Sequence, residues 1–368
     1  YHMVDGASPY LSSNFVNENF EKKKKKLNGI EQIKPRWKRV VETADFCLGE
    51  ALGEEYIKTA FSPESKARML EMVDNIKVAF GERIKTLDWM TDSTKTEALN
   101  KLSTFTVKIG YPDKWRDYSN LEIDRGAYVL NVIRAAEFEA NRNYAKIGQP
   151  VDKNEWGMTP QTVNAYYNPS NNEIVFPAAI LQPPFFDPKA DDAVNYGGIG
   201  AVIGHEITHG FDDQGRMYDA KGNLQMWWKD EDNSKFVERA NRVVDQFNSY
   251  CPLDSVCING RLTLGENIAD FGGITIAYQA YTMTEEFKAA QKIAGFTPQQ
   301  RFFIGFGRIW AGQYRESAMR TQLLTNVHSP GKWRVNGTVV NIPEWYQAFG
   351  IKEGDKMYLP ETDRAKIW

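Results

Sequence analysis

The segment Val202–Gly210, with the sequence VIGHEITHG, constrains the fold more than any other part of the chain. It contains the pattern H-E-x-x-H, in which His205 and His209 stand four residues apart. Residues four apart on an α-helix lie on one face, so both imidazoles can bind a single Zn²⁺. Glu206 would then lie beside the metal, where it can take a proton from zinc-bound water. The pattern predicts a zinc-binding helix over about residues 193–211.

The third zinc ligand has to come from elsewhere in the chain. A catalytic zinc takes three protein ligands and keeps one position open. No histidine follows at the spacing of the longer pattern H-E-x-x-H-x-x-G-x-x-H. The segment Thr263–Asp270, TLGENIAD, offers two carboxylates four residues apart, which share one face of a helix. We predict that Glu266 binds the metal and that Asp270 accepts the free N–H of a zinc-bound histidine.

Each of the two motifs has an ordinary alternative. The first could be an accidental pair of histidines on a helix, but the chain has only four histidines, so such a pair is rare by chance. The second could be two surface acids on a capped helix, because acids are common on exposed faces. Taken together, the motifs complete one ligand set and favour a site for one zinc ion per chain.

Composition narrows the class of protein. The 368 residues suffice for two domains with sizeable cores. The net charge is -3 and charged residues make up 25%, which gives no electrostatic basis for binding nucleic acid. No apolar run reaches the length of a membrane span, and no signal peptide stands at the start. Because Tyr1–Val4 leads directly into a helical pattern, we expect the missing N-terminal half to be a second chain or a cleaved fragment.

The residue pattern predicts helices over most of residues 1–110, including one that starts at Ser62–Pro63. The apolar face of that helix consists of Met69, Val73, Ile76, Phe80, Ile84 and Leu87. The other main predicted helices cover residues 125–147, 263–283 and Pro298 to about Arg315. Residues 163–167 and 174–176 are predicted to form two strands joined by a turn at 168–172.

Several stretches of the chain resemble the neprilysin family of zinc metallopeptidases, which also includes endothelin-converting enzymes and bacterial oligopeptidases of the PepO type. These stretches are HEITHGFDDQGR (His205–Arg216), GENIAD (Gly265–Asp270), NAYY (Asn164–Tyr167), VFPAAILQPPFF (Val175–Phe186) and HSPGKWR (His328–Arg334). The resemblance covers essentially the whole chain and is strongest from residue 150 onward. It implies that the chain corresponds to the C-terminal half of the family's full length.

The resemblance implies roles around the metal. His205, His209 and Glu266 would bind zinc. Glu206 would act as general base and later as proton donor, and Asp270 would support a zinc ligand from behind. These roles agree with those that the two motifs predict from their spacing.

The resemblance also implies substrate contacts. Asn164 and Ala165 would hold the substrate backbone as an added strand at a sheet edge, in agreement with the predicted strand. His328 would hydrogen-bond the tetrahedral oxyanion, and Arg334 would contact a substrate carbonyl. The residues that match the family's apolar pocket beyond the cleaved bond are Ile180, Phe185, Val202, Ile309 and Trp310. From the residues alone, His328 could lie in a surface loop, Arg334 could pair with a surface acid, and the pocket residues could serve packing only.

Cysteine use bears on the cellular location. Cys251 and Cys257 bracket a short loop and could form a local disulfide or remain two free thiols. A single sequon occurs at Asn336-Gly337-Thr338. The family works mostly at cell surfaces, in secretions or in the periplasm, with some bacterial cytosolic members. We therefore expect an extracytoplasmic protein, with the bacterial cytoplasm as the alternative.

Together, these features predict a mainly α protein with a small β-sheet, of the α+β class. Residues 1–110 would form part of a helical lid domain, and residues 111–368 a thermolysin-like zincin catalytic domain. The predicted activity is zinc-dependent hydrolysis of internal bonds in short peptides, with Glu206 assisting the attack of zinc-bound water. The apolar pocket predicts a bulky hydrophobic residue on the leaving-group side of the cleaved bond.

Overall fold

The computed structural model describes residues 2–368, which fall into two compact units. The smaller unit consists of residues up to 60, 111–162 and 314–321. The larger unit consists of residues 61–110, 163–313 and 322–368. The predicted boundary after residue 110 is one of several points at which the chain passes from one unit to the other. The assignment of the two predicted domains to a lid and a catalytic part stays a prediction.

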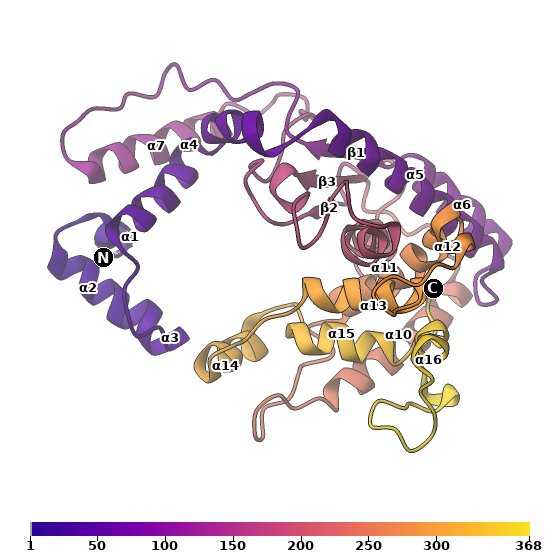
Figure 1. The fold of residues 1–368 in the computed structure, drawn as a ribbon. Helices are drawn as coiled ribbons and strands as arrows, with labels where there is room; N and C mark the ends of the chain where they lie inside the picture. The colour runs from indigo at the N-terminus through magenta and orange to yellow at the C-terminus, as the bar shows by residue number, and fades with distance from the viewer. Residues whose placement is uncertain (1) are drawn as a thin grey trace. The chain divides into compact units, whose positions relative to one another are not determined.

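The smaller unit is helical throughout its regular structure. Its long helices, α4 (Arg36–Ala60) and α7 (Tyr128–Tyr144), pack on each other (Figure 1). The short helices are α1 (His2–Ala7), α2 (Ser13–Phe20) and α3 (Lys26–Asn28), with a π-helical segment at Glu21–Lys25. The lysines of that segment are mostly exposed, as expected for a solvated helix face, and Lys23 binds Asp5 at 2.8 Å.

Helix α5 (Pro63–Thr86) opens the larger unit and begins where its sequence predicts. The Ser62 hydroxyl oxygen accepts a hydrogen bond from the Ser65 amide at 3.1 Å, and Pro63 occupies the first helical position. The predicted apolar face is buried, and its members Met69, Val73, Ile76, Phe80 and Ile84 are at most 1% exposed. This face contacts α11 (Leu264–Thr282), the helix that carries Glu266 and Asp270.

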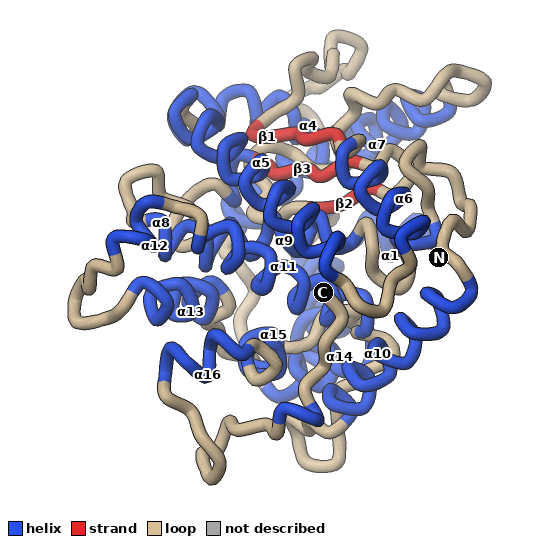
Figure 2. The backbone as a smooth tube through the Cα atoms, turned by 90° about the vertical axis from the view of Figure 1, so that its right-hand side faces the viewer, coloured by secondary structure: helices blue, strands red, loops and turns tan. Residues whose placement is uncertain are grey.

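The larger unit also contains a three-stranded sheet with the order β1-β3-β2 (Figure 2). Strand β2 (Tyr166–Asn168) pairs antiparallel with β3 (Glu173–Pro177), which confirms the predicted pair of strands and the turn between them. Strand β2 lies at the sheet edge, but Asn164 and Ala165 come just before it instead of within it.

Strand β1 (Thr106–Gly110) corrects the prediction that residues 1–110 are helical to their end. It follows α6 (Asp92–Ser103) and pairs in parallel with β3. Residues 106–109, with the sequence TVKI, alternate between polar and apolar side chains, which is a short strand signal that the prediction of helices up to residue 110 overlooked.

The H-E-x-x-H motif ends a nearly continuous helical run. The run consists of α8 (Asp192–Asn195), a π-helical segment (Tyr196–Gly200) and α9 (Ala201–His209). It matches the predicted zinc-binding helix. The remaining helices are α10 (Asp230–Asn248), α12 (Glu285–Ala289), α13 (Pro298–Ile309), α14 (Glu316–Thr325), α15 (Gly331–Val339) and α16 (Pro343–Phe349). The prediction that α13 extends to about Arg315 is wrong, because the backbone leaves the helical conformation at Trp310.

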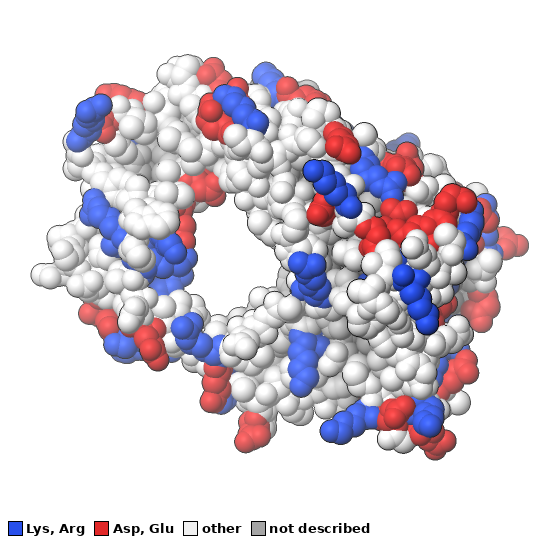
Figure 3. Space-filling model, in the orientation of Figure 1, with Lys and Arg blue, Asp and Glu red and all other residues white. Residues whose placement is uncertain are grey.

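The surface gives two further findings. No helix among residues 2–368 combines the length and the apolarity that crossing a bilayer requires. On the face that Figure 3 shows, acidic and basic side chains are intermixed over the larger unit.

Helix α11 lies in the middle of the larger unit, where it contacts α5, α9, α10 and α15 (Figure 1). It meets α9 through glycines. A Cβ atom on Gly204 would lie 2.7 Å from the Gly273 carbonyl oxygen, and one on Gly273 would lie 2.6 Å from the Ala201 carbonyl oxygen. The backbones therefore touch, and side chains from both helices reach one point. The predicted fold class, mainly α with a small sheet, is confirmed.

This contact predicts the effect of a single methyl group. Gly273→Ala should lower the free energy of unfolding by about 1–3 kcal/mol, because the added atom forces the two backbones apart. Denaturant unfolding measures the change. Gly81→Ala in α5 is the matched control, because its Cβ would meet only Leu99 and Leu102 side chains at 3.7 and 3.8 Å. The control should leave stability unchanged or raise it by up to ~1 kcal/mol. Equal effects of the two substitutions would contradict the close packing.

Candidate metal centre and active site

Three side-chain atoms from two helices converge on one point. The Nε2 atoms of His205 and His209 are 3.0 Å apart. Oε2 of Glu266 lies 3.2 Å from the first nitrogen and 3.7 Å from the second. Ligands held tetrahedrally at the zinc bond length of ~2.1 Å are roughly 3.4 Å apart. The three predicted ligands thus stand at the spacing that one zinc ion requires, and no other cluster of three such side chains is found among residues 2–368.

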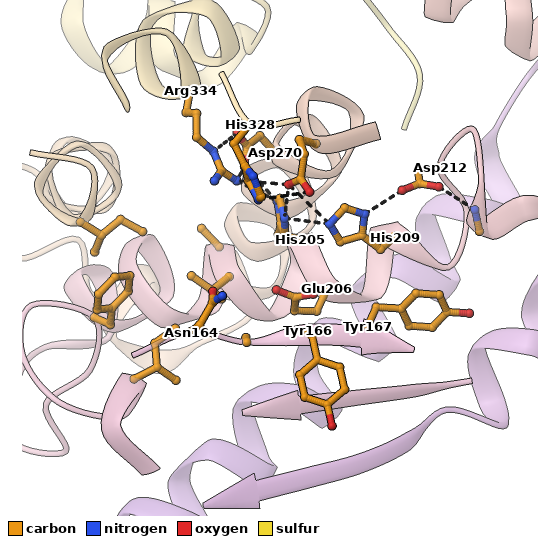
Figure 4. A pocket seen from close by; sticks show the side chains of 18 of the residues that line it. Asn164, Tyr166, Tyr167, His205, Glu206, His209, Asp212, Asp270, His328 and Arg334 are labelled. Carbon is orange, nitrogen blue, oxygen red and sulfur yellow. Dashed lines mark hydrogen bonds and ion pairs between the residues drawn. The ribbon is translucent and has the colours of Figure 1, made fainter. Parts of the chain in front are cut away.

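Each histidine has a carboxylate behind it (Figure 4). Oδ1 of Asp270 lies 2.9 Å from Nδ1 of His205, which is the contact predicted from the motif. Oδ2 of Asp212 lies 2.7 Å from Nδ1 of His209. The sequence analysis noted Asp212 only as a departure from the longer histidine pattern and missed this role. The sequence feature that could have indicated this role is the position of Asp212 three residues after His209, at the end of the helix, where the chain turns back.

The protonation of this cluster shows that a cation fits it. A carboxylate only accepts hydrogen bonds, so each histidine carries its proton on Nδ1 and presents a bare lone pair at Nε2. When both histidines are neutral, their Nε2 lone pairs and Oε2 of Glu266 face one another. Oε2 of Glu266 is also buried and has no hydrogen-bond partner among residues 2–368. Two imidazole nitrogens and one carboxylate oxygen at this spacing match the ligand set of a zinc ion.

The local charges shift the pKa values of all three groups. Burial alone would lower the pKa of both histidines, but Asp270 and Glu266 raise that of His205, and Asp212 and Glu266 raise that of His209 further. Burial alone would raise the pKa of Glu266, but the adjoining histidines hold it far below its usual range. The charged form of each group is therefore stabilised by neighbouring groups of the opposite charge.

Glu206 lies beside this cluster and is not part of it. Its carboxylate is buried, and burial raises its pKa above the usual range. In Figure 4 it lies on the side of the imidazoles that faces Tyr166 of β2. Such a carboxylate, next to the predicted zinc ligands and open to a cavity, has the position that a general base requires.

The cavity next to the cluster has a volume of about 560 Å³. All fourteen predicted site residues line it, and they come from the strand region, α9, α11, α13 and the segment around α15. They are Asn164, Ala165, Ile180, Phe185, Val202, His205, Glu206, His209, Glu266, Asp270, Ile309, Trp310, His328 and Arg334. Phe306 of α13, which is not among the predicted site residues, lines the cavity too.

His328 contacts the predicted metal ligands through Glu266. Its Nε2 lies 3.2 Å from Oε1 of Glu266, and its Nδ1 lies 3.0 Å from the Asn326 side-chain oxygen. Its side chain is 44% exposed, so it is a loop histidine that also reaches the site. The next residue, Ser329, is buried and donates a hydrogen bond to Oδ1 of Asn267 at 2.8 Å. Because Asn267 follows Glu266, this bond ties the loop to α11 beside the ligand.

Arg334 pairs with a buried acid, contrary to the alternative that it pairs with a surface acid. Its Nε and Nη2 atoms donate to the two carboxylate oxygens of Asp270, both at 2.7 Å. Its guanidinium also stacks on the Trp310 ring at 3.8 Å. Arg334 therefore fixes the carboxylate that holds His205, and its predicted contact with a substrate carbonyl stays a prediction.

Family models place the chain among known proteins. A family model described as peptidase family M13 matches residues 164–365, which is more than half of the chain. The chain belongs to peptidase family M13. A second model of this family, for its N-terminal part, matches residues 1–112. The expected restriction to the C-terminal half is thus corrected, because the chain also carries part of the family's N-terminal region.

Relatives and solved structures agree with this assignment. The chain is 38% identical to the endothelin-converting enzyme homolog of Locusta migratoria, covering 100% of this chain and 51% of that protein. It is 37% identical to neprilysin-3 of Drosophila melanogaster over 94% of this chain and 45% of that protein. The chain spans about half the length of these relatives.

Among solved structures, the inhibitor complex of Mycobacterium tuberculosis zinc metalloprotease Zmp1 is similar with a TM-score of 0.96 at 46% identity, over 100% of this chain and 56% of that one. PepO from Lactobacillus rhamnosis is similar with a TM-score of 0.90 at 34% identity, over 99% and 56% of the two chains. At these identities, the structural similarity supports the zincin fold of the M13 peptidases for this chain.

The carboxylate behind His209 gives a testable expectation for this M13 chain. Asp212→Asn should weaken zinc affinity about 10–100-fold, because the amide no longer fixes the tautomer of His209 or raises its basicity. Titration against a competing chelator measures the affinity. Asp213→Asn is the control, since Asp213 lies on the same turn without a contact to either histidine. A wild-type affinity in the Asp212 variant would show that this contact does not support the metal.

Proposed function

We propose that the chain is the catalytic part of a zinc-dependent endopeptidase of short peptides. The observation that carries the proposal is that two histidines and a glutamate with zinc-ligand spacing meet beside a buried carboxylate, in a cavity at the edge of a sheet. The zinc relatives of the M13 family support the same activity. A purely structural zinc site has no use for a general base beside the metal, so Glu206 favours catalysis over a zinc-stabilised binding module.

His205, His209 and Glu266 would hold the ion, which would supply a Lewis acid for water and for the scissile carbonyl. Glu206 would take a proton from the attacking water and later deliver it to the leaving nitrogen. Burial raises the pKa of Glu206, which suits a group that both accepts and returns a proton near neutral pH. His328 would donate a hydrogen bond to the oxyanion, and Arg334 would contact a substrate carbonyl.

The sheet edge supports a peptide as the substrate. Strand β2 has β3 on one side, and the segment Asn164–Ala165 just before it lines the cavity. An extended peptide can add to such an edge through backbone hydrogen bonds. Asn164 and Ala165 would hold the substrate backbone beside Glu206, with the scissile bond facing the zinc ligands.

The apolar side of the cavity supports a preference for a bulky hydrophobic residue after the cleaved bond. This side is formed by Ile180, Phe185, Val202, Phe306, Ile309 and Trp310. The pocket floor is buried, with Ile180 at 3% and Ile309 at 9% exposed, and filling it removes apolar surface from water.

Two further proposals concern the setting of the protein. Cys251 and Cys257 are bonded, and a disulfide favours an oxidising, extracytoplasmic location over the bacterial cytoplasm. The sequon gives no support, because Thr338 is fully buried in α15. The remaining part of a longer protein, as a second chain or a fragment, is the proposed partner that completes the enzyme.

The role of Glu206 gives the decisive test of the activity. Glu206→Gln should abolish cleavage of an internally quenched peptide, since the amide accepts no proton, while zinc affinity stays close to wild type. Chelation of the wild-type protein should abolish cleavage as well, and added zinc should restore it. Glu266→Ala is the companion variant, which should lose both zinc and activity. Residual turnover at the wild-type rate in the Gln variant would refute the mechanism.

The apolar pocket predicts substrate preference. In a peptide series that differs only at the residue after the cleaved bond, replacing Phe or Leu by Ala should lower kcat/KM about 10–200-fold, because the pocket is left partly unfilled. Replacement by Asp should lower kcat/KM further, since a charge would lose its hydration there. Rates that do not depend on this residue would rule out the pocket as the specificity site.

A further inference from the structure

Lys101 is a buried cation that no part of the proposed mechanism uses. It lies in α6, is 1% exposed and comes from a region in which the sequence analysis assigned no chemistry. Its ammonium donates three hydrogen bonds, to the carbonyl oxygens of Gly210, Gly215 and Tyr218 at 2.7, 2.8 and 2.6 Å. All three protons of the ammonium are thus used, and every acceptor belongs to one segment of backbone.

That segment is the turn 210–218, which follows the zinc helix directly. The three carbonyls stand at the start, within and at the end of the turn, so the ammonium holds three points of its backbone close together. Asp212 lies between the first two. Its Oδ1 accepts from the amides of Gln214 and Gly215 at 2.8 and 2.7 Å, which leaves Oδ2 for His209.

The turn returns tightly onto the end of α9. A Cβ atom on Gly215 would collide with the carbonyl oxygen of His209, so the backbone of the turn touches the residue that carries the ligand. The Gly210 carbonyl lies just past the end of α9, where the partial negative charge of the helix dipole favours a cation. A shift of the turn would therefore move Asp212 relative to His209.

Aromatic rings close the surroundings of the ammonium. The rings of Phe211, Tyr167 and Trp227 have their centres 5.5, 5.9 and 5.9 Å from Nζ. Two of the carbonyls have a second donor, because Nε1 of Trp227 donates to the Tyr218 carbonyl and the Tyr218 amide donates to the Gly215 carbonyl, both at 3.0 Å. The Lys101 ammonium is the donor that all three carbonyls share. An apolar side chain at position 101 would leave three carbonyl oxygens of the turn without the cation that now joins them.

We propose that Lys101 is a positioning residue of the metal centre: it holds the turn 210–218 so that Asp212 keeps His209 oriented toward the zinc. The proposal rests on the zinc site proposed above. It links α6 to the ligand through an unbroken series of contacts, from Nζ of Lys101 to the turn backbone, from the backbone amides to Asp212, and from Asp212 to Nδ1 of His209.

A double-mutant cycle with Asp212 tests this pathway, because residues that act through one another have non-additive effects. In the complete chain, Lys101→Met should weaken zinc affinity about 10-fold or more, in the range known for outer partners of zinc ligands. Lys101→Gln should have a smaller effect. In the Asp212→Asn background, Lys101→Met should change zinc affinity less than 2-fold, since the link to His209 is already broken. Chelator competition gives the affinities, and the absorption spectrum of the Co²⁺-substituted protein gives the ligand geometry.

The controls separate positioning from stability. Lys108→Met removes a largely covered lysine of the same unit, whose side chain is 10% exposed and whose ammonium binds Glu173 at 2.7 Å. It should lower the Tm of the metal-free protein and leave zinc affinity and the Co²⁺ spectrum unchanged. Additive effects of the Lys101 and Asp212 substitutions would overturn the proposal, and so would a wild-type zinc affinity in either Lys101 variant.

Two outcomes need to be told apart. If Lys101→Met does not fold, Lys101→Gln carries the test by itself, because it keeps a donor in place of the ammonium. If the wild-type chain and its Glu266→Ala variant bind zinc equally, the metal centre itself is wrong. If Glu266→Ala loses zinc while the Lys101 variants bind it as wild type does, only the role of Lys101 is wrong.

Discussion

The structure depends on three lone pairs that face one another. Nε2 of His205, Nε2 of His209 and Oε2 of Glu266 lie within 3.0–3.7 Å of one another. Without a metal ion, either the three lone pairs repel one another or protons must lie between them. A zinc ion bound at this point would remove the repulsion and replace the protons. Stability and metal affinity are coupled for this reason, because a ligand that binds only the folded state stabilises it by mass action.

Two features of the fold hold these atoms in place: a close contact between two helices, and charged side chains behind the ligands. Glycines let α9 and α11 touch, so that ligands from two distant segments meet. Behind the ligands, the surroundings of His205 and of His209 are built alike. Asp270 orients His205 and is itself held by Arg334 through two hydrogen bonds. Asp212 orients His209 and is held by the turn 210–218, whose carbonyls accept hydrogen bonds from Lys101. In each case, a buried cation acts on a histidine through an acid.

This layered design explains which parts of the site the sequence could reveal. Pairs four residues apart on one helix, such as His205 and His209 or Glu266 and Asp270, follow from helix geometry alone. The start and apolar face of α5 follow from local capping and periodicity. Lys101 gave no signal, because its partners are backbone carbonyls more than 100 residues away and carry no side-chain pattern. Strand β1 did leave a local signal, because residues 106–109 alternate between polar and apolar side chains, and its pairing with β3 confirms that signal.

The charges of the site decide its state without zinc. Glu266 belongs to the cluster, the carboxylates of Glu206, Asp212 and Asp270 lie around it, and two basic side chains, Lys101 and Arg334, stand behind it. Burial lowers the pKa of Lys101 to about 7, so the four carboxylates outnumber the positive charges that face them. In the metal-free protein, the adjoining carboxylates raise the pKa of both histidines against the effect of burial, and burial raises the pKa of Glu206. A bound divalent ion would favour the unprotonated form of all three groups. It would thereby free the histidines as ligands and leave Glu206 ionised, which is the form in which a carboxylate can accept a proton.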